Sequence, residues 1–543
     1  MKPTDFRETT TQAAITGSLR IGVGRPRIHG QSHPDFKISV DGDQCRIDDK
    51  PVASIDEWLR ILETDRLSEV IGAFALAWKR PDGSMLLARD AIGERTLYYS
   101  RTPTGVAFAS SVRDLLKLSD ISRRLDPLAV AMYLTYAYIP GHRTLIDGVY
   151  ELLPGEMKVF RAGREHSSQL WSIPPEPEQY LEPEASLTQR LRLALESAVR
   201  DRLVPHKPIA AFLSGGLDSS LVVALANQLH DAVIHTFSAS FGRDYPNELA
   251  FSTLLAKHCG TIHHIVELPS KVVLHYLDET IGFLSDPIGD PLTVPNALLF
   301  REASQFSQCV LNGEGGDPCF GGPKNLPMVL AELYGTSSPS ERESSYLRAH
   351  LKCYDELAEM LTPEFSTFLA AHQLESEIQP YFDDPRWRKF VTKLQMLNVR
   401  FKGGHHILPK VDALSAPFGM FPRSPLFDRR VVELSFEIPP QWKLYGSVEK
   451  YLLKQSVKDI VPDAIIRRPK SGMMVPVEGW FAGPLLPEAK SRLLDGLKNY
   501  GIFRRDYLER LLAGKLGGPR PRHGVKIWLL ITLEAWLRKV FRG

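Results

Sequence analysis

The segment Ile209-Ala-Ala-Phe-Leu-Ser-Gly-Gly-Leu-Asp-Ser-Ser-Leu-Val-Val-Ala224 sets the pattern for the larger part of this chain. An apolar run precedes its two glycines and apolar helix formers follow Asp218, which predicts a buried strand, a tight turn and a helix. Adjacent glycines let backbone N–H groups approach an anion, and a helix start adds unpaired N–H donors at the positive end of its dipole. The turn is therefore predicted to hold a pyrophosphate group.

The turn offers the backbone of Gly215 and Gly216 and the hydroxyls of Ser214, Ser219 and Ser220. Its carboxylate, Asp218, would repel a phosphate unless a divalent cation stood between them, so Mg²⁺ is expected to accompany the nucleotide. The turn lacks the lysine of the Gly-x-x-x-x-Gly-Lys-Ser/Thr loop, which argues against a kinase or GTPase site. It resembles the pyrophosphate loop of the ATP pyrophosphatases, enzymes that adenylate a substrate. The alternative is an ordinary strand–turn–helix capped by Ser and Asp.

Strand-like and helix-like segments alternate around this turn. A helix is predicted over 186–202 and another over 247–258, and strands over 235–241, 263–268 and 309–311, the last ending in Asn312-Gly-Glu-Gly-Gly-Asp317. The alternation predicts a doubly wound parallel sheet with ligands at the carboxyl ends of its strands. The rest of the chain is predicted to be mainly helical, with one irregular loop over 402–428.

Before residue 171 the signals are short and β-like, with Pro, Asp and Gly turns between them. Strands are predicted over 38–40, 70–79, 84–89, 97–100 and 106–109, and helices over 54–63 and 112–116. A Pro/Glu-rich stretch over 174–183 has the composition of a linker. We therefore expect an α+β domain over 1–175 and an α/β domain over 184–543.

Composition excludes several classes of function. The 543 residues carry a formal net charge of +2, so no broad basic field for nucleic acid is expected, and the basic C-terminal end is predicted to be a solvated rim. The five cysteines show no C-x-x-C spacing, which supports neither a disulfide framework nor a zinc site. No apolar run approaches the ~18 residues of a membrane span, so we expect a cytoplasmic protein without a membrane partner.

Several motifs together resemble the asparagine synthetase superfamily along nearly the whole chain. They lie at 72–78, 88–99, 108–111, 138–155, 214–220, 235–238, 313–317, 320–322, 449–450 and 468–470. The resemblance implies an Ntn-hydrolase-like glutaminase domain followed by an ATP pyrophosphatase-like synthetase domain. Members that hydrolyse glutamine use a cysteine exposed at position 2 as nucleophile, but position 2 is Lys here and the nearest cysteine is Cys45. The first domain is therefore interpreted as a degenerate glutaminase.

The resemblance assigns nucleotide and metal positions. It implies that Leu213 and Ala239 contact adenosine, that Asn312 and Gly313 approach the nucleotide, and that Asp218 and Asp317 bind Mg²⁺. Two carboxylates converging on one ion suit ATP cleavage, because the ion neutralises the leaving pyrophosphate.

It also assigns catalytic positions. Glu314 matches a glutamate that supports formation of the acyl-adenylate in asparagine synthetases, where β-lactam synthetases carry Tyr. Lys470 matches a lysine that stabilises negative charge on phosphate or on the tetrahedral oxyanion. Lys450 would be a second phosphate-side charge. The alternatives are a surface lysine for Lys470 and a helix-surface ion pair for Lys450.

His405 and His406 follow two glycines in the predicted loop, where asparagine synthetases have a different sequence. One imidazole could take a proton from an attacking ammonium, although a structural role is the commoner one for loop histidines. Near residue 428 the family's acceptor segment is replaced as well: Arg423 and Asp428 persist, and Phe421 stands in place of a carboxylate. The acceptor pocket should therefore differ from that of aspartate.

These observations favour an ATP-dependent ligase that adenylates a carboxylate and lets an amine, in the same molecule, displace AMP to form a lactam or macrolactam. A lasso peptide cyclase acting on a precursor peptide, with a leader protease as partner, is the preferred hypothesis. Alternatives are an ammonia-dependent asparagine synthetase, a β-lactam synthetase-like enzyme acting on a small molecule, and a non-catalytic interaction protein.

Overall fold

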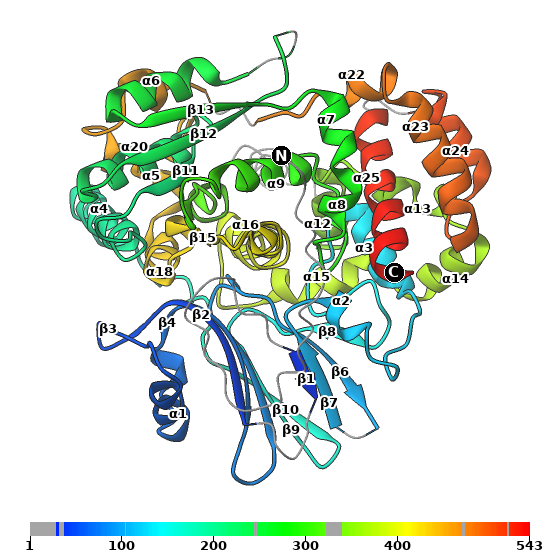
Figure 1. The fold of residues 1–543 in the computed structure, drawn as a ribbon, viewed down its shortest axis with the longest axis horizontal. Coiled ribbons are helices and arrows are strands. Elements are labelled where there is room, and N and C mark those ends of the chain that lie inside the picture. The colour runs from blue at the N-terminus through cyan, green and yellow to red at the C-terminus, as the bar shows by residue number, and fades with distance from the viewer. Residues whose placement is uncertain are drawn as a thin grey trace, which may run out of the picture.

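The computed structural model describes residues 29–31, 37–103, 105–243, 245, 247–321, 339–469, 473–517 and 521–542. A sheet-rich part, built from the first third of the chain, lies below a larger part of helices around a parallel sheet (Figure 1). The expected division into a sheet-rich and an α/β part is confirmed.

Two antiparallel sheets form the sheet-rich part, in the orders β10-β9-β5-β4-β2-β3 and β1-β7-β6-β8. Their strands are β1 (His29–Gln31), β2 (Ile38–Ile47), β3 (Lys50–Pro51), β4 (Ile71–Lys79), β5 (Met85–Arg89), β6 (Tyr98–Thr102), β7 (Gly105–Ala109), β8 (Val149–Glu151), β9 (Glu156–Arg161) and β10 (Arg164–Gln169). The five expected strands are confirmed, with ends that differ by a few residues and a longer β2.

Strand β4 shows why this part is layered. Its side chains alternate between two faces: Ala75 and Ala77 belong to the core between the two sheets, whereas Phe74 and Leu76 belong to a separate core. That second core is completed by Trp58 of helix α1 (Ile55–Glu63). The helix packs on the outer face of the larger sheet, so the sheet is covered on both sides.

The larger part contains the predicted parallel sheet, in the order β13-β12-β11-β14-β15. Its strands are β11 (Ile209–Phe212), β12 (Ile234–Ser240), β13 (Ile262–Glu267), β14 (Cys309–Leu311) and β15 (Phe421–Arg423). Helices α4 (Glu184–Arg200), α5 (Leu217–Leu229), α6 (Leu249–Cys259) and α9 (Thr293–Ala303) flank it (Figure 1). Strand β15 was not anticipated, because it lies inside the segment predicted to be a loop.

The loop prediction for 402–428 is wrong over its first half. The π-helix η3 (Asn398–Ile407) continues into α17 (Leu408–Ser415). The two glycines that suggested a loop serve close packing instead: a Cβ on Gly403 would lie 2.9 Å from the ring of Phe427, and one on Gly404 would lie 2.7 Å from Pro154. Steric contact, and not turn geometry, accounts for glycine at these positions.

The remaining described elements are mostly helices. They are η1 (Leu67–Glu69), α2 (Val112–Leu115), α3 (Pro127–Tyr136), α7 (Ser270–His275), α8 (Leu277–Ile281), α10 (Gly316–Phe320), α12 (Pro339–Ala349), η2 (Tyr354–Glu356), α13 (Leu357–Met360), α14 (Pro363–Ala371), α15 (Leu374–Asp383), α16 (Phe390–Leu397), η4 (Ala416–Phe418), η5 (Pro425–Phe427), α18 (Arg429–Glu437), α19 (Pro440–Lys443), the hairpin β16 (Leu444–Tyr445) and β17 (Val448–Glu449), α20 (Tyr451–Val457), α21 (Asp463–Arg467), α22 (Val477–Ala482), α23 (Leu486–Ser491), η6 (Arg492–Gly496), η7 (Leu497–Tyr500), α24 (Arg505–Leu512), α25 (His523–Trp536) and η8 (Leu537–Phe541).

The two parts share one hydrophobic core across their contact. Tyr133 of α3 is fully buried in that core, and its hydroxyl donates a hydrogen bond of 2.7 Å to the carbonyl of Leu529 in α25. Helix α3 therefore packs against the larger part although it precedes β8 in the chain. The boundary over 175–184 stays a prediction.

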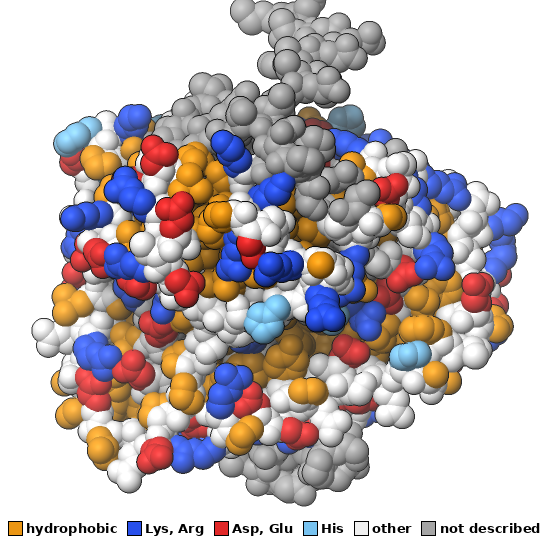
Figure 2. Space-filling view, turned by 90° about the horizontal axis from the view of Figure 1, so that it is seen from below, with side chains coloured by type: hydrophobic (Ala, Val, Ile, Leu, Met, Phe, Trp, Pro, Cys, Tyr) orange, Lys and Arg blue, Asp and Glu red, His pale blue; other side chains and the backbone are white. Residues whose placement is uncertain are grey.

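The surface agrees with the nearly neutral charge. On the face seen from below, basic and acidic side chains are mixed over the described residues (Figure 2). Within the described ranges, no helix combines the length and the apolar character that crossing a membrane requires.

Candidate active site

A cavity of about 230 Å³ opens where β11, β12 and β14 end. Nine of the predicted site residues line it: Leu213, Ser214, Asp218, Ser219, Ala239, Asn312, Gly313, Glu314 and Asp317. They come from three strand ends that are distant in the sequence. The parallel sheet brings them together because the carboxyl ends of its strands share one edge.

The predicted pyrophosphate turn is held by its own serines. The Ser214 hydroxyl lies 3.1 Å from that of Ser219, which also accepts a hydrogen bond of 3.2 Å from the Ser214 N–H. Gly215 has a φ of +83°, and a Cβ there would lie 2.7 Å from the backbone nitrogen of Ser252. Gly216 is the N-cap of α5 and, as a glycine, supplies no side-chain hydrogen bond to the N–H groups at the start of this helix.

The turn after β14 packs directly on the start of α5. A Cβ on Gly313 would lie 2.4 Å from the nitrogen of Ser219, and one on Gly316 would lie 2.2 Å from the carboxyl carbon of Asp218. These two glycines allow Asp317 to approach Asp218. Glycine is thus required by close contact at both positions.

Lys450 lies between the two predicted metal ligands. Its Nζ atom is 2.5 Å from a carboxylate oxygen of Asp218 and 2.5 Å from one of Asp317. Burial lowers the pKa of Lys450, but the two carboxylates outweigh burial and hold that pKa above its usual value. Lys450 also has a left-handed backbone, with a φ of 56°, at the start of α20. Strained backbone of this kind is concentrated at functional sites.

The pair of carboxylates is suited to a divalent cation. Asp218 and Asp317 already converge on one positive charge, and carboxylate oxygens are the ligands that Mg²⁺ takes. Among the described residues no group of three or more His, Cys, Asp or Glu side chains is arranged to hold a metal. A cation here would therefore be held by two carboxylates, together with ligands from outside the chain.

Other predicted residues do not line the 230 Å³ cavity. The side chain of Ser220 is buried inside α5. Gly216 and Lys450 line a smaller adjoining cavity of about 30 Å³, together with Arg468 and Pro469. Lys470 itself lies outside the described residues.

The motif that contains Lys470 nevertheless reaches the turn. The Nη1 atom of Arg468 donates a hydrogen bond of 2.9 Å to the carbonyl of Gly215, and Arg468 also pairs with Glu248. Arg468, which follows α21 directly, therefore ties the end of this helix to the predicted pyrophosphate turn.

Glu314 stands beside two lysines. Burial raises the pKa of its carboxyl group, and the ammonium groups of Lys410 and Lys402 oppose that rise. Lys402 lines the cavity, whereas Lys410 pairs with Asp290 at 2.6 Å. Sequence reasoning missed Lys402 and Lys410, and the only signal was a basic residue at each end of a histidine pair.

Neither histidine of that pair lines the 230 Å³ cavity. His405 Nδ1 lies 2.9 Å from Glu151 of β8, and His406 Nε2 lies 3.4 Å from Asp290. Burial lowers the pKa of His406 to about 4, which makes it a weak base at neutral pH. Both residues lie on η3, so the prediction of loop histidines is wrong.

Arg423 and Asp428 do not line the 230 Å³ cavity either. Arg423 pairs with Asp43 of β2 at 3.1 Å, and Asp428 pairs with Arg202 at 2.6 Å and caps α18. These buried pairs join the larger part to the sheet-rich part and to the end of α4. Both residues line a separate cavity of about 20 Å³ at this contact.

Cys45 is unsuited to act as the missing nucleophile. It is buried, its Sγ donates to the carbonyl of Ala73 at 3.3 Å, and burial raises the pKa of its thiol well above the usual value. A thiol that stays protonated is a poor nucleophile. The other four cysteines are buried as well.

A parallel sheet with this turn, these paired carboxylates and this cavity defines a synthetase part of the ATP pyrophosphatase-like class. Residues 190–538 match the asparagine synthase family, and residues 58–171 match the glutamine amidotransferase domain. The chain therefore belongs to the asparagine synthase family of ATP-dependent ligases, which implies ATP as a substrate.

Curated relatives agree with this assignment at low identity. Asparagine synthetase [glutamine-hydrolyzing] 1 of Bacillus subtilis is 24% identical over 88% of this chain and 79% of its own length. A putative asparagine synthetase [glutamine-hydrolyzing] of Mycobacterium bovis is 26% identical over 87% of this chain and 77% of its own length. Among solved structures, an NH3-dependent NAD synthetase from Campylobacter jejuni covers 36% of this chain and 96% of its own at 13% identity, with a TM-score of 0.20.

Proposed function

We propose that this protein adenylates a substrate carboxylate with ATP and that an amine of the same molecule then displaces AMP to form a lactam. The new C–N bond replaces the C–O bond to AMP, and the amine proton leaves to a base or to solvent. A macrolactam-forming cyclase of a precursor peptide, of the lasso type, is the form that we favour. A leader protease would then be a partner in the same pathway.

One observation carries the proposal: Asp218 and Asp317 meet around a single cationic centre at a cavity built from three strand ends. Adenylation needs charge stabilisation where pyrophosphate departs. Mg²⁺ held by these two carboxylates would supply it by neutralising the leaving group. Lys450 and the N–H groups at the start of α5 would bind the phosphate chain from the protein side.

The intramolecular amine is supported by two residues in the first third of the chain. Position 2 is Lys, and Cys45 is buried with a raised pKa. A glutamine-derived ammonia supply is therefore unsupported, and an amine carried by the substrate removes the need for one. Arg423 and Asp428 are engaged in buried ion pairs away from the cavity, which is consistent with an acceptor other than aspartate.

The second candidate is an ammonia-dependent asparagine synthetase. Glu314 lines the cavity, and the relatives reported above are named asparagine synthetases. The same adenylation would then act on aspartate, with free ammonia as the acceptor. The two candidates differ only in the acid and the amine.

Pyrophosphate release from ATP tests both candidates with purified protein. One series supplies aspartate with ammonium, and the other supplies linear peptides that carry both a free N-terminal amine and an acidic side chain. Pyrophosphate release with a peptide, together with loss of one water from its mass, supports the cyclase. Asparagine formation supports the second candidate, and no acid-dependent pyrophosphate release in either series contradicts the proposal of a ligase acting on these substrate classes.

A further inference from the structure

The continuous helix formed by η3 and α17 presents three different faces. Lys402, Ile407 and Val411 line the 230 Å³ cavity. His406 and Lys410 face Asp290. The third face, with Gly404, His405 and Asp412, contacts the sheet-rich part. The wide turns of the π-helix allow this arrangement, and π-helical turns often occur at functional sites.

The third face is fastened by buried charges. Glu151 of β8 accepts hydrogen bonds from Arg89 at 2.6 Å and lies 2.9 Å from His405 Nδ1. Burial raises the pKa of Glu151, but His405 and Arg89 outweigh burial and hold that pKa below its usual value. Arg89 also donates a hydrogen bond of 3.2 Å to the carbonyl of Gly404. Glu151 therefore links the sheet-rich part to the helix through one ionised carboxylate.

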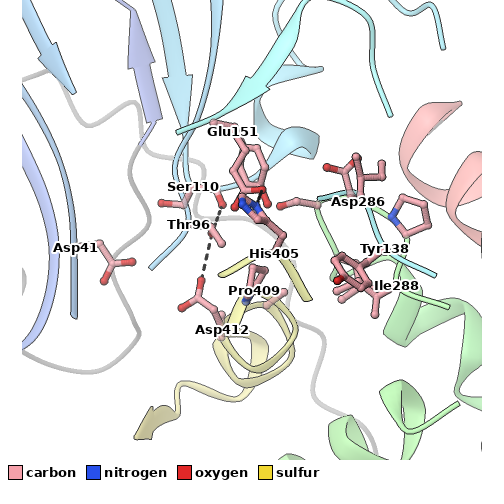
Figure 3. Close-up of a pocket in the computed structure, with 17 residues that line it drawn as sticks. Asp41, Thr96, Ser110, Tyr138, Glu151, Asp286, Ile288, His405, Pro409 and Asp412 are labelled. Carbon is pink, nitrogen blue, oxygen red and sulfur yellow. Dashed lines mark hydrogen bonds and ion pairs between the residues drawn. The ribbon is translucent and has the colours of Figure 1, made fainter. Parts of the chain in front are cut away.

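A second group of contacts lies further along the helix. Asp412 accepts hydrogen bonds of 3.3 Å from the Arg95 guanidinium and 3.3 Å from the Thr96 hydroxyl. Between the two groups lies a cavity of about 20 Å³, which both Glu151 and Asp412 line. Figure 3 shows Glu151 and His405 pointing toward each other on one side of this cavity and Thr96 toward Asp412 on the other. The helix is thus held at two places along its length.

We propose that the sheet-rich part positions one wall of the active-site cavity, and that Glu151 and Arg89 are the positioning residues. They fix the rotation and the height of η3, and so fix where Lys402 stands beside Glu314. The tight contact of Gly404 with Pro154 leaves little room for the helix to shift. Removing Glu151 leaves the buried side chains of Arg89 and His405 without their acidic partner. An unpaired buried charge is costly, so we expect the helix to shift until that charge is paired or solvated.

Hydrogen exchange of the full-length protein tests the positioning. Glu151→Gln removes the charge with little change of shape, and we expect about tenfold faster amide exchange over 398–415 with unchanged exchange over 217–229 in α5. Glu165→Gln is the matched control, because Glu165 lies on β10 of the same part and is exposed. Unchanged exchange over 398–415 in Glu151→Gln overturns the proposal.

Gly404→Ala provides an independent variant in case Glu151→Gln does not fold. A Cβ at this position would lie 2.7 Å from Pro154 and would push the helix away from the sheet-rich part without altering any charge. We expect the same local increase in exchange. A Gly404→Ala protein with wild-type exchange over 398–415 also overturns the proposal.

A titration with MgATP separates positioning from general destabilisation, and this readout rests on the proposed function. We expect Glu151→Gln to raise the Kd for MgATP about threefold to tenfold in the wild-type background. In a Lys402→Met background the same change should have little further effect, because Glu151 acts on MgATP through Lys402 and the effects of coupled residues are not additive. If the effects of Glu151→Gln and Lys402→Met on the Kd for MgATP are additive, Glu151 does not act through the cavity wall that carries Lys402. Absence of MgATP binding to the wild type would instead contradict the proposed function, while the exchange experiment still decides the positioning.

Discussion

The ammonium group of Lys450 lies 2.5 Å from Asp218 and 2.5 Å from Asp317, at the centre that the two carboxylates share. This lysine is itself buried and neutralises two partly buried acidic groups. A metal cation that binds Asp218 and Asp317 must compete with the ammonium group of Lys450 or displace it. The stability of the site and its metal response are therefore linked.

The first prediction concerns Lys450→Met. Removing the lysine leaves two partly buried carboxylates close together without their shared cation, so we expect a lower melting temperature. Millimolar Mg²⁺ should raise the melting temperature of the variant, because the metal replaces the lost charge, and should change the wild type much less. Lys458→Met, an exposed lysine just after α20, is the control. A Lys450→Met protein with wild-type stability and no Mg²⁺ response would contradict the shared centre.

The second prediction concerns the carboxylates. Asp218→Ala and Asp317→Ala should each lower acid-dependent ATP–pyrophosphate exchange by ~10² or more, because each removes part of the charge stabilisation of the leaving group. Asp231→Asn, an exposed residue just beyond α5, serves as the control. Near-normal exchange in either folded active-site variant would refute the assignment.

The third prediction concerns Lys470, whose role rests on the sequence. If it stabilises the tetrahedral oxyanion, Lys470→Met should stop amide formation and leave ATP–pyrophosphate exchange measurable, because charge stabilisation acts where charge develops. If it acts on the phosphates, both activities should fall together. Lys515→Met, an exposed lysine near α24, is the control. Product formation at the wild-type rate would exclude both roles.

The fourth prediction is that glutamine is not hydrolysed. Lys stands at position 2, and every cysteine in the chain is buried, with the pKa of Cys45 raised by burial. Glutamate release from glutamine should therefore stay at the level of a protein-free blank. Steady release by the purified protein would show that another nucleophile acts.

The fifth prediction concerns pH. Burial raises the pKa of Asp286, which lines the small cavity in Figure 3, to about 8. The unfolded carboxyl group ionises near pH 4, so between about pH 4 and pH 8 folding takes up a proton. The contribution of this group to the free energy of unfolding should fall as pH rises, by up to ~1.4 kcal/mol per pH unit, and level off above pH 8.

Asp286→Asn removes this titration. In urea unfolding at several pH values, the difference between wild type and variant should change across that window and favour the variant increasingly toward pH 8. Asp120→Asn, an exposed residue after α2, should show no such trend. If the difference in the free energy of unfolding between wild type and Asp286→Asn does not change with pH, the carboxyl group of Asp286 ionises alike in the folded and the unfolded chain. That outcome would contradict the raised pKa of Asp286.

The sequence predicted a large share of the fold. The parallel sheet, four of its five strands and the glycine-rich turn follow from apolar runs that end in Gly, Ser and Asp, because local propensity and burial agree there. The alternation of Phe74 and Ala75 along β4 is equally local. Gly403 and Gly404 misled the prediction, because glycine required for contact with a distant side chain cannot be told from glycine required by a turn.

The sequence by itself determined the chemistry that is available: two carboxylates at strand ends, a glycine-rich turn, and a lysine at position 2. Only the tertiary structure decided how these groups meet. It placed Lys450 between Asp218 and Asp317, although Asp218 lies 232 positions away in the sequence. It also bound His405 to Glu151 across the two parts. Such pairs depend on the packing of whole elements against each other, and no local pattern of residues encodes that packing.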